Sequence, residues 1–189
     1  MLMMLYGDKI CTPRLCLRRV SEEDIPLLVA WSNSAGAHGE FLSPEGISEE
    51  GMRVRLASGV LWTERSKTFL IEQRRGQAIG TVQYWLRPER GECAVMAVKV
   101  SLPELRNQGY GTEAQKYLII NLFQRMKLAE VEMYTDINNK AQQRCLEKLG
   151  FQLVQSLGYD DHQVHRLGHL YRLGNEQYQL HPVYQYVYE

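Results

Sequence analysis

The sequence predicts a single domain of the α/β class over residues 1–189, with about seven strands and about four helices. A length of 189 residues fits one globular domain and accommodates two only if both are small. Hydrophobic residues make up 44% of the chain and charged residues 23%, a composition typical of folded proteins. Segments with the two-residue period of strands also alternate with segments of helical period. Disordered, collagen-like and low-complexity classes are therefore excluded.

The first predicted elements are a strand over residues 14–20 and a helix that opens at Ser21. Ser21 and Asp24 approximate a capping pair, and Pro26 stands in the first turn, where proline is tolerated. Residues 34–51 hold several glycines and a proline among scattered apolar side chains. We predict a long loop there, and long loops often carry function.

The middle of the chain predicts one helix followed by three strands. Apolar residues share a helical face over residues 49–64, although Gly59 weakens this prediction. Residues 67–73 and 77–86 are rich in strand formers and are separated by a short turn, which predicts an antiparallel hairpin. Residues 92–100 contain an unbroken apolar run, which favours a central strand covered on both faces.

The last third predicts two helices and three strands. Residues 112–128 carry apolar side chains four positions apart and form the strongest helix of the sequence. A short strand over residues 131–135 precedes a helix over residues 138–149, which Gly150 ends. Residues 151–173 predict two strands joined by a polar segment.

Charge and cysteine spacing narrow the possible partners. Lys and Arg total 22 and Asp and Glu total 22, so no net field draws the molecule to nucleic acid or to an anionic membrane. The four cysteines lie in no metal-binding or dithiol spacing, so we predict structural thiols and no metal site. The apolar start of the chain is too short for a signal peptide, and no run is long enough to span a bilayer. We expect a cytoplasmic protein.

The most informative segment lies between the apolar strand and the strong helix. It consists of Arg106, Asn107, Gln108, Gly109, Tyr110, Gly111 and Thr112. The two glycines let the backbone turn closely, so that several amides point to one place, and the helix that follows adds a partial positive charge at its amino end. This combination predicts a site for a diphosphate. The Walker and dinucleotide-binding glycine patterns do not match, so we predict that the ligand is neither ATP nor NAD.

The run from Arg106 to Gly111 matches the [RQ]xxGx[GA] loop, and the chain thereby resembles the GNAT superfamily of acetyl-CoA-dependent N-acetyltransferases. Asn139, followed by Leu-Glu-Lys-Leu-Gly-Phe over residues 146–151, resembles the second motif of that family. Residues 14–31 resemble the opening of its RimJ/RimL-like branch. The resemblance spans about residues 12–178, with the motifs in the family's order and at its separations.

The resemblance implies the GNAT fold, a mixed and mostly antiparallel sheet. Its fourth and fifth strands, here about residues 93–100 and 131–135, would splay apart to admit the pantetheine arm of acetyl-CoA. Backbone groups of Val98 and Val100 would then pair with the pantetheine amides, and Asn139 would contact the arm. Backbone amides from Arg106 to Thr112 would hold the pyrophosphate.

The reaction that the resemblance implies is transfer of the acetyl group to a primary amine, either a protein N-terminus or a small molecule, by direct attack in a ternary complex. This chemistry requires removal of a proton from the ammonium, stabilisation of the oxyanion by a strand amide near Val98, and protonation or solvation of the leaving sulfur. The acceptor itself is not identified by the sequence.

The usual catalytic side chains of the family are missing at the matching positions. The position of the carboxylate base holds Val95 or Met96, and the position of the acid holds Leu146 or Gln142. Our catalytic candidates are Gln142, whose amide can donate to a thiolate, and Glu92 at the strand start. Further candidates for the base are Glu40, His162 and His165.

Two alternatives remain open. The missing base and acid are compatible with a module that binds or senses acyl-CoA without turnover. In the tail, Tyr184, Tyr186 and Tyr188 alternate with a period of two. This is compatible with one face of an added strand or with the covering of a neighbour's sheet edge, and hence with a homodimer. We interpret His162 and His165 as solvated loop residues rather than metal ligands.

Overall fold

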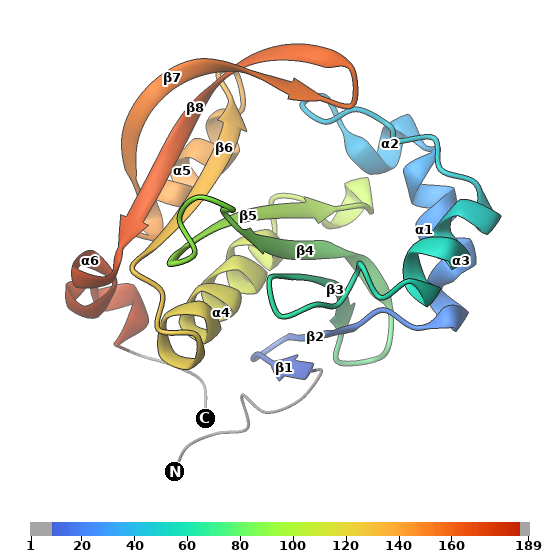
Figure 1. Cartoon of the computed structure of the whole chain (residues 1–189), viewed down its shortest axis with the longest axis horizontal. Helices are drawn as coiled ribbons and strands as arrows, with labels where there is room; N and C mark the ends of the chain where they lie inside the picture. Colours follow the sequence, from blue (N-terminus) through green and yellow to red (C-terminus); the bar gives the residue numbers. More distant parts are fainter. Residues whose placement is uncertain (1–8, 186–189) are drawn as a thin grey trace.

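The structure, a computed structural model, describes residues 9–185 and contains one eight-stranded sheet with helices packed against it (Figure 1). The strands are β1 (Lys9–Cys11), β2 (Leu15–Arg19), β3 (Ser66–Gln73), β4 (Ala78–Leu86), β5 (Cys93–Val100), β6 (Glu130–Asp136), β7 (Gln152–Asp161) and β8 (Val164–Gly174). The α-helices are α1 (Ile25–Ser32), α2 (Ala35–His38), α3 (Glu49–Ala57), α4 (Tyr110–Arg125), α5 (Lys140–Lys148) and α6 (Asn175–Leu180).

The strands follow the order β1-β2-β3-β4-β5-β6-β8-β7 across the sheet. The pair β5 and β6 is parallel, and the other neighbouring strands are antiparallel. The predicted α/β class and the mixed, mostly antiparallel sheet are confirmed. The described part of the chain has one more strand than expected, because the short β1 pairs with β2 at the sheet edge. The strands expected to splay are therefore β5 and β6 rather than the fourth and fifth.

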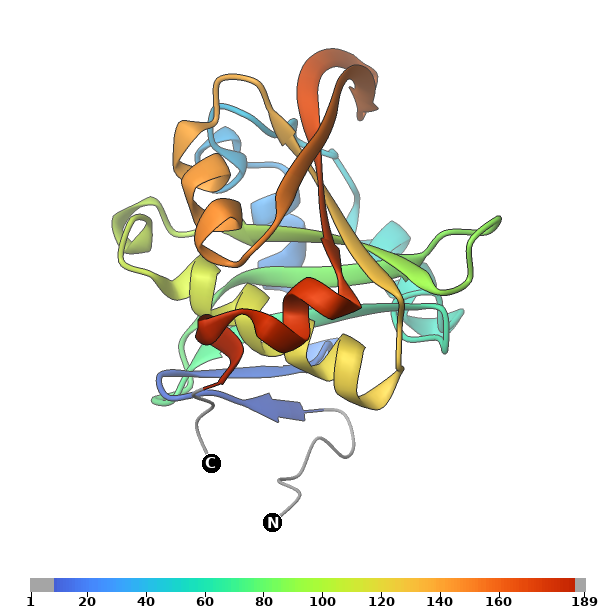
Figure 2. The same ribbon diagram turned by 90° about the vertical axis from the view of Figure 1, so that its left-hand side faces the viewer.

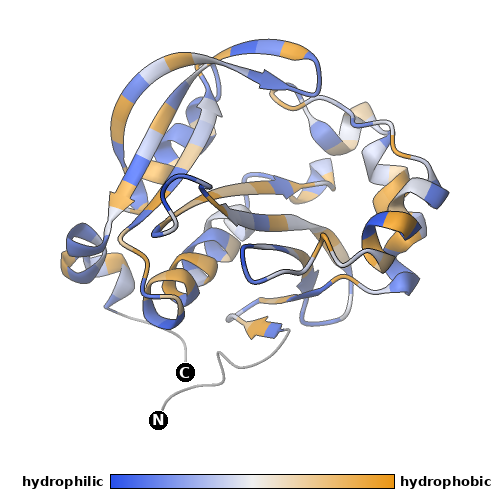
Figure 3. Ribbon diagram, viewed as in Figure 1, coloured by the Kyte–Doolittle hydropathy of each residue, from blue (hydrophilic) through white to orange (hydrophobic). Residues whose placement is uncertain are grey.

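Each face of the sheet carries its own hydrophobic cluster. On one face α4 and α6 lie side by side (Figure 2). Helix α4 buries Leu118 and Leu122 against β2–β6. The rings of Phe123 in α4 and Tyr178 in α6 stack with centroids 4.4 Å apart. On the other face α1, α2 and α3 pack around Trp31. Hydrophobic residues concentrate in β5 and in α4, whereas the turn between β4 and β5 is hydrophilic (Figure 3).

Four predicted boundaries need correction. The predicted loop over residues 34–51 contains α2, which Ser34 caps by accepting a hydrogen bond from Ala37 N. Helix α3 ends at residue 57 rather than 64, because Gly59 adopts a φ of 79° that an α-helix does not allow. Helix α4 begins two residues earlier than predicted, directly after Gly109. In the tail, α6 precedes a 3₁₀ turn, Pro182–Tyr184.

The prediction of a tail strand is wrong for Tyr184. This residue is buried in the 3₁₀ turn, and its hydroxyl donates to the Leu149 carbonyl at 2.6 Å, so it packs within its own chain. Tyr186 and Tyr188 lie outside the described residues. The homodimer stays a prediction.

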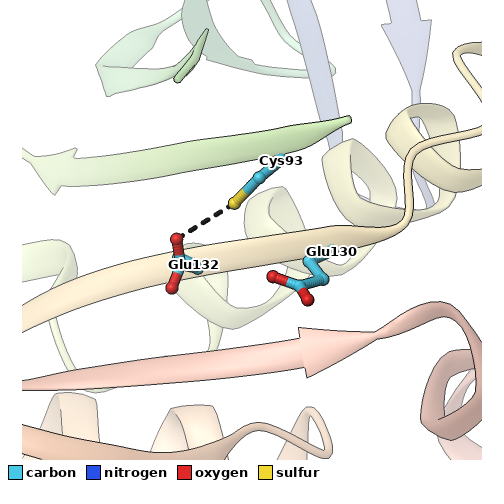
Figure 4. Close-up of side chains that lie close together, drawn as sticks. All are labelled: Cys93, Glu130 and Glu132. Atoms are coloured by element: carbon cyan, nitrogen blue, oxygen red, sulfur yellow. Dashed lines mark hydrogen bonds between the residues drawn. The ribbon is translucent and has the colours of Figure 1, made fainter. Parts of the chain in front are cut away.

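A buried carboxylate ties together the strands at the closed end of the sheet. Glu132 of β6 is 1% exposed and accepts hydrogen bonds from Arg87 Nε at 2.6 Å and Arg172 Nη2 at 2.8 Å. The Cys93 thiol of β5 donates to its Oε1 at 3.0 Å, and Glu130 lies beside it (Figure 4). Because Arg87 follows β4 and Arg172 belongs to β8, one side chain connects four neighbouring segments. We call these five residues the Glu132 cluster.

The Glu132 cluster has the ligand types of a metal site, since Cys93, Glu130 and Glu132 offer atoms within 4.8 Å of one another. Both carboxylates are already paired with arginines. Burial, followed by the hydrogen bond to Glu132, raises the pKa of the Cys93 thiol to about 12, so the sulfur keeps its proton and donates it. The Glu132 cluster is therefore a network of ion pairs that holds neighbouring strands together, which we call the ionic lock.

We expect Glu132→Ala to lower the free energy of unfolding by about 3–5 kcal/mol, because the arginine charges would stay behind without their carboxylate. Urea denaturation measures this change. Glu147→Ala, which removes an exposed carboxylate from α5, serves as the matched control and should stay within about 0.5 kcal/mol of the wild type. A loss of similar size in both variants would contradict the lock.

The same carboxylate makes stability depend on pH. Hydrogen bonds from Cys93, Arg87 and Arg172 outweigh burial and hold the pKa of Glu132 below its ordinary value. Its stabilisation is therefore fully present above the unfolded pKa and is lost as pH falls through the folded pKa. The stability difference between wild type and Glu132→Gln should stay constant from pH 6 to 8 and shrink below about pH 4. Urea titrations across this pH range check it.

Candidate functional site

The parallel pairing of β5 and β6 stops halfway along both strands. The register runs from Cys93 opposite Glu130 to Met96 opposite Met133. Beyond that point β5 stays paired with β4 as far as Val100, and β6 stays paired with β8 as far as Asp136. The sheet therefore opens, and a cavity of about 580 Å³ lies at the opening, lined by both strands.

The β4–β5 ladder decides which backbone groups of β5 face the opening. Arg87 N bonds to Cys93 O at 2.9 Å, and Ser101 N bonds to Ile79 O at 2.7 Å, so the odd-numbered residues of β5 face β4. Antiparallel pairs alternate, and the N–H and C=O groups of even-numbered residues consequently point the other way. Val98 and Val100, which the sequence analysis named for cofactor binding, are both even-numbered, so their backbone groups point away from β4.

The loop after β5 is held by Arg106. Its Nε donates to the Val100 carbonyl at 2.9 Å, and its Nη2 donates to the carbonyls of Gly36 and Ala37 at 2.7 and 3.0 Å. The guanidinium thus joins the end of β5 to α2. The Arg106 side chain therefore holds these backbone segments together.

The bend itself depends on Gly109. Its φ is 84°, in the left-handed region, and a Cβ at this position would lie 3.1 Å from Arg14 Nη2. Helix α4 starts at Tyr110 and runs for sixteen residues, so its unpaired amides and positive end face the bend. Gly111 and Thr112 fall in the first turn of this helix, and Asn107 and Gln108 precede the bend.

The sequence did not identify Arg14 as a site residue, although it lies beside this loop. Its guanidinium sits 4.3 Å from the centre of the Tyr110 ring and donates to Gln108 O at 3.0 Å and to Glu113 Oε2 at 2.7 Å. It remains 44% exposed, so a cation stands at the edge of the bend. Its position at the start of a strand almost a hundred residues earlier in the chain gave no signal of this contact.

Asn139 and Gln142 both line the cavity. Asn139 caps α5, where its Oδ1 accepts from Gln142 N at 3.1 Å. The Gln142 side chain donates from Nε2 to Gln115 Oε1 at 2.9 Å. Glu92 lies elsewhere: it is exposed at the start of β5, beyond the closed end, and does not line the cavity.

The remaining base candidates lie at or beyond the rim of the cavity. Glu40 is exposed and outside the lining. His162 lines the cavity, whereas His165 is 70% exposed and its Nδ1 lies 3.1 Å from Asp160 Oδ1. Of the candidate bases named from the sequence, only His162 therefore stands at the cavity.

One wall of the cavity is formed by α2 and by the face of β5 that points away from α4. His38 Nδ1 donates to the Ser34 carbonyl at 2.9 Å, and since a carbonyl only accepts, Nε2 of the neutral ring carries the lone pair. Lys99 Nζ donates to this Nε2 at 3.4 Å. Burial lowers the pKa of both side chains. Sequence reasoning missed this pair, because α2 was not predicted.

The hairpin of β7 and β8 contributes to the lining of the same cavity. It arches over the molecule toward the segment that follows α2 (Figure 1). At its end Asp161 Oδ2 accepts from Ser43 N at 2.8 Å and from Arg166 Nε at 3.0 Å, and Arg166 Nη2 donates to Ser43 Oγ at 2.9 Å. Charge-assisted hydrogen bonds thus fix the end of the β7–β8 hairpin to the segment that contains Ser43.

Comparison with known proteins agrees with this geometry. A family model described as an acetyltransferase (GNAT) domain matches residues 14–152. No curated protein matches the chain. No helix among residues 9–185 is long and apolar enough to cross a membrane.

Three solved structures share the fold. RimL, a ribosomal L7/L12 alpha-N-protein acetyltransferase in complex with coenzyme A, is 16% identical with a TM-score of 0.75, over 88% of this chain and 97% of that one. The spermidine N-acetyltransferase SpeG, a chimera from Vibrio cholerae and hSSAT, is 14% identical with a TM-score of 0.74, over 88% and 98%. An acetyltransferase of the GNAT family from Bacillus anthracis is 20% identical with a TM-score of 0.73, over 89% and 99%.

We expect Arg106→Lys to loosen the loop almost as much as Arg106→Ala, because an ammonium cannot reach all three carbonyls at once. Each variant should lose about 1.5–3 kcal/mol of unfolding free energy and exchange the amide hydrogens of residues 107–112 faster than the wild type. Hydrogen exchange with mass spectrometry measures the loop directly. Arg144→Ala, an exposed arginine of α5, is the control. Full protection in Arg106→Lys would show that charge alone matters.

Proposed function

This chain belongs to the GNAT acetyltransferase family, and we propose that it acetylates a primary amine by direct attack within a ternary complex. As a member of this family it is an acetyltransferase with acetyl-CoA as its cofactor, and it transfers acetyl groups to amines. The ternary complex, the individual site residues and the kind of amine are our inferences.

The opening between β5 and β6 carries the proposal. The first turn of α4 adjoins the open end of β5, since a Cβ on Gly111 would lie 3.6 Å from Val100 Cγ2. The cavity itself is lined by His38 and by the end of the β7–β8 hairpin. A ligand that follows the exposed backbone edge of β5 would leave free the part of the cavity beside His38 and Lys99, which we call the acceptor wall. Both substrates can then occupy the opening together, which direct transfer requires.

The backbone would supply most of the cofactor contacts. Amides from Arg106 to Thr112 would hold the pyrophosphate at the end of α4, a mode of phosphate binding that needs no net positive charge. The outward backbone groups of Val98 and Val100 would pair with the pantetheine amides as a neighbouring strand would. Asn139 would contact the same arm from the start of α5.

The chemistry would use groups that are fixed before substrates bind. Val98 N–H would donate to the acetyl oxygen, where negative charge develops during attack. The Gln142 amide has a second hydrogen besides the one given to Gln115, and it would solvate the sulfur as the C–S bond breaks. Glu92 has no part in this proposal because it does not line the cavity.

The acceptor would be the amine of a protein N-terminus or of a small molecule. The two solved relatives with named acceptors represent both classes, since RimL is an alpha-N-protein acetyltransferase and SpeG acetylates spermidine. The walls of the cavity combine the aromatic rings of Trp31, Trp85 and Tyr159 with carboxylates that already have arginine partners. Such a wall favours an amine attached to an apolar or aromatic group over a strongly charged one.

Calorimetry with CoA and acetyl-CoA tests the cofactor site. We expect binding to the wild type and an affinity at least about tenfold weaker in Gly109→Trp, because an indole would fill the bend and clash with Arg14. Gly59→Trp is the matched control, since Gly59 also has a positive φ but open space around it. Equal binding by wild type and Gly109→Trp would remove the basis of the proposal.

A panel of primary amines with thiol detection tests turnover. Sustained CoA release with at least one amine is expected, with the release dependent on both substrates at saturation. Binding of acetyl-CoA without release for any peptide or small amine would instead support a cofactor-binding module.

A further inference from the structure

Lys99, His38 and the Ser34 carbonyl form a chain of hydrogen bonds at the acceptor wall. The carbonyl fixes the ring tautomer from 2.9 Å, so the Nε2 lone pair faces Lys99 Nζ at 3.4 Å. An amine, a base within reach and a third group that orients the base are the parts of an activated nucleophile. His38 is 8% exposed, so the ring is held by its surroundings.

The charges around Lys99 leave its ammonium without a direct counter-ion among residues 9–185. The two nearby carboxylates have other partners: Glu45 pairs with Arg55 at 2.5 Å, and Asp161 pairs with Arg166 at 3.0 Å. Burial lowers the pKa of Lys99 by more than the two carboxylates raise it, so the net shift is downward. A fraction of neutral amine is therefore present at lower pH than for an exposed lysine.

The charged groups that face His38 act in the same sense. Burial is the main cause of its lowered pKa, and Lys99 and His162 lower it further, whereas Asp161 and the hydrogen bond to Ser34 raise it. The ring is consequently neutral near pH 7 and able to accept a proton at Nε2.

The strand places this amine beside the position proposed for the acetyl group. Lys99 lies between Val98 and Val100, whose outward backbone groups would follow the pantetheine arm. Its side chain leaves the opposite face of β5 from α4 and lines the cavity. This step rests on the proposed function, because it takes the cofactor along that backbone edge.

We propose that Lys99 is a site of self-acetylation, in which the bound acetyl-CoA acetylates Nζ when no acceptor amine occupies the cavity. Neutral Nζ attacks the thioester carbon, a C–N bond forms, the C–S bond breaks and CoA leaves as the thiolate. The proton released from Nζ passes to His38 Nε2. The product is an amide, which does not pass its acetyl group to another amine. The acetylated side chain occupies space at the acceptor wall, so the modified enzyme turns over more slowly.

Mass spectrometry of the full-length protein incubated with acetyl-CoA alone tests this proposal. We expect one added acetyl group, located on Lys99 by peptide fragmentation, at a rate at least about tenfold above that of the exposed Lys148. Lys99→Arg should remove this modification, and Lys148→Arg should retain it. His38→Gln should slow it by about tenfold or more, since the proton acceptor is lost.

The cofactor-site variant separates the two proposals. Gly109→Trp should abolish acetylation of Lys99 while Gly59→Trp keeps it, if bound acetyl-CoA is the donor. Lys99 acetylated no faster than Lys148 in a wild type that binds CoA would overturn the self-acetylation and leave the proposed function intact. Equal acetylation of Lys99 in Gly109→Trp would overturn it as well, because free acetyl-CoA would then be the donor. Absence of CoA binding would reject both.

Discussion

The hydrogen-bonded carboxylate of Glu132 sets where the sheet is closed and, by consequence, where it opens. Its partners Arg87, Arg172 and Cys93 come from the segments on either side, and a buried charge satisfied in this way resists separation of the strands. The parallel register of β5 and β6 holds at this end and stops at Met96. Without a firm closed end, the two strands would have no defined point from which to diverge.

The opening gives the two faces of β5 different tasks. Val98 belongs to the face that packs toward α4, whereas Lys99 points to the side of α2 and the β7–β8 hairpin. The backbone edge between them faces the gap. One strand thus presents a polar main-chain edge at the gap and a separate side-chain surface to the cavity. In the function that we propose, the cofactor would take the first and the acceptor amine the second.

The arginines of this site act chiefly on the protein itself. Arg106 donates hydrogen bonds to three backbone carbonyls, and Arg14 donates to Glu113 and to the Gln108 carbonyl. Arg106 ties the loop to the end of β5 and to α2, and Arg14 ties the residues on either side of the bend at Gly109. Arg106, the arginine of the loop motif, is therefore a residue that positions the backbone.

The sequence by itself determined the periodic elements and the loop at Gly109, because helical and strand periods and a glycine bend are local properties of the chain. The strands of the hairpin at β3 and β4 and the helices α4 and α5 were predictable for that reason. Short α2 lacked such a period, and its formation depends on the Ser34 cap and on the carbonyl contacts of Arg106. Only the tertiary structure brought His38 to Lys99, 61 positions apart, and placed Glu92 outside the cavity lining. The distance in space between residues far apart in the chain is set by packing and not by local pattern.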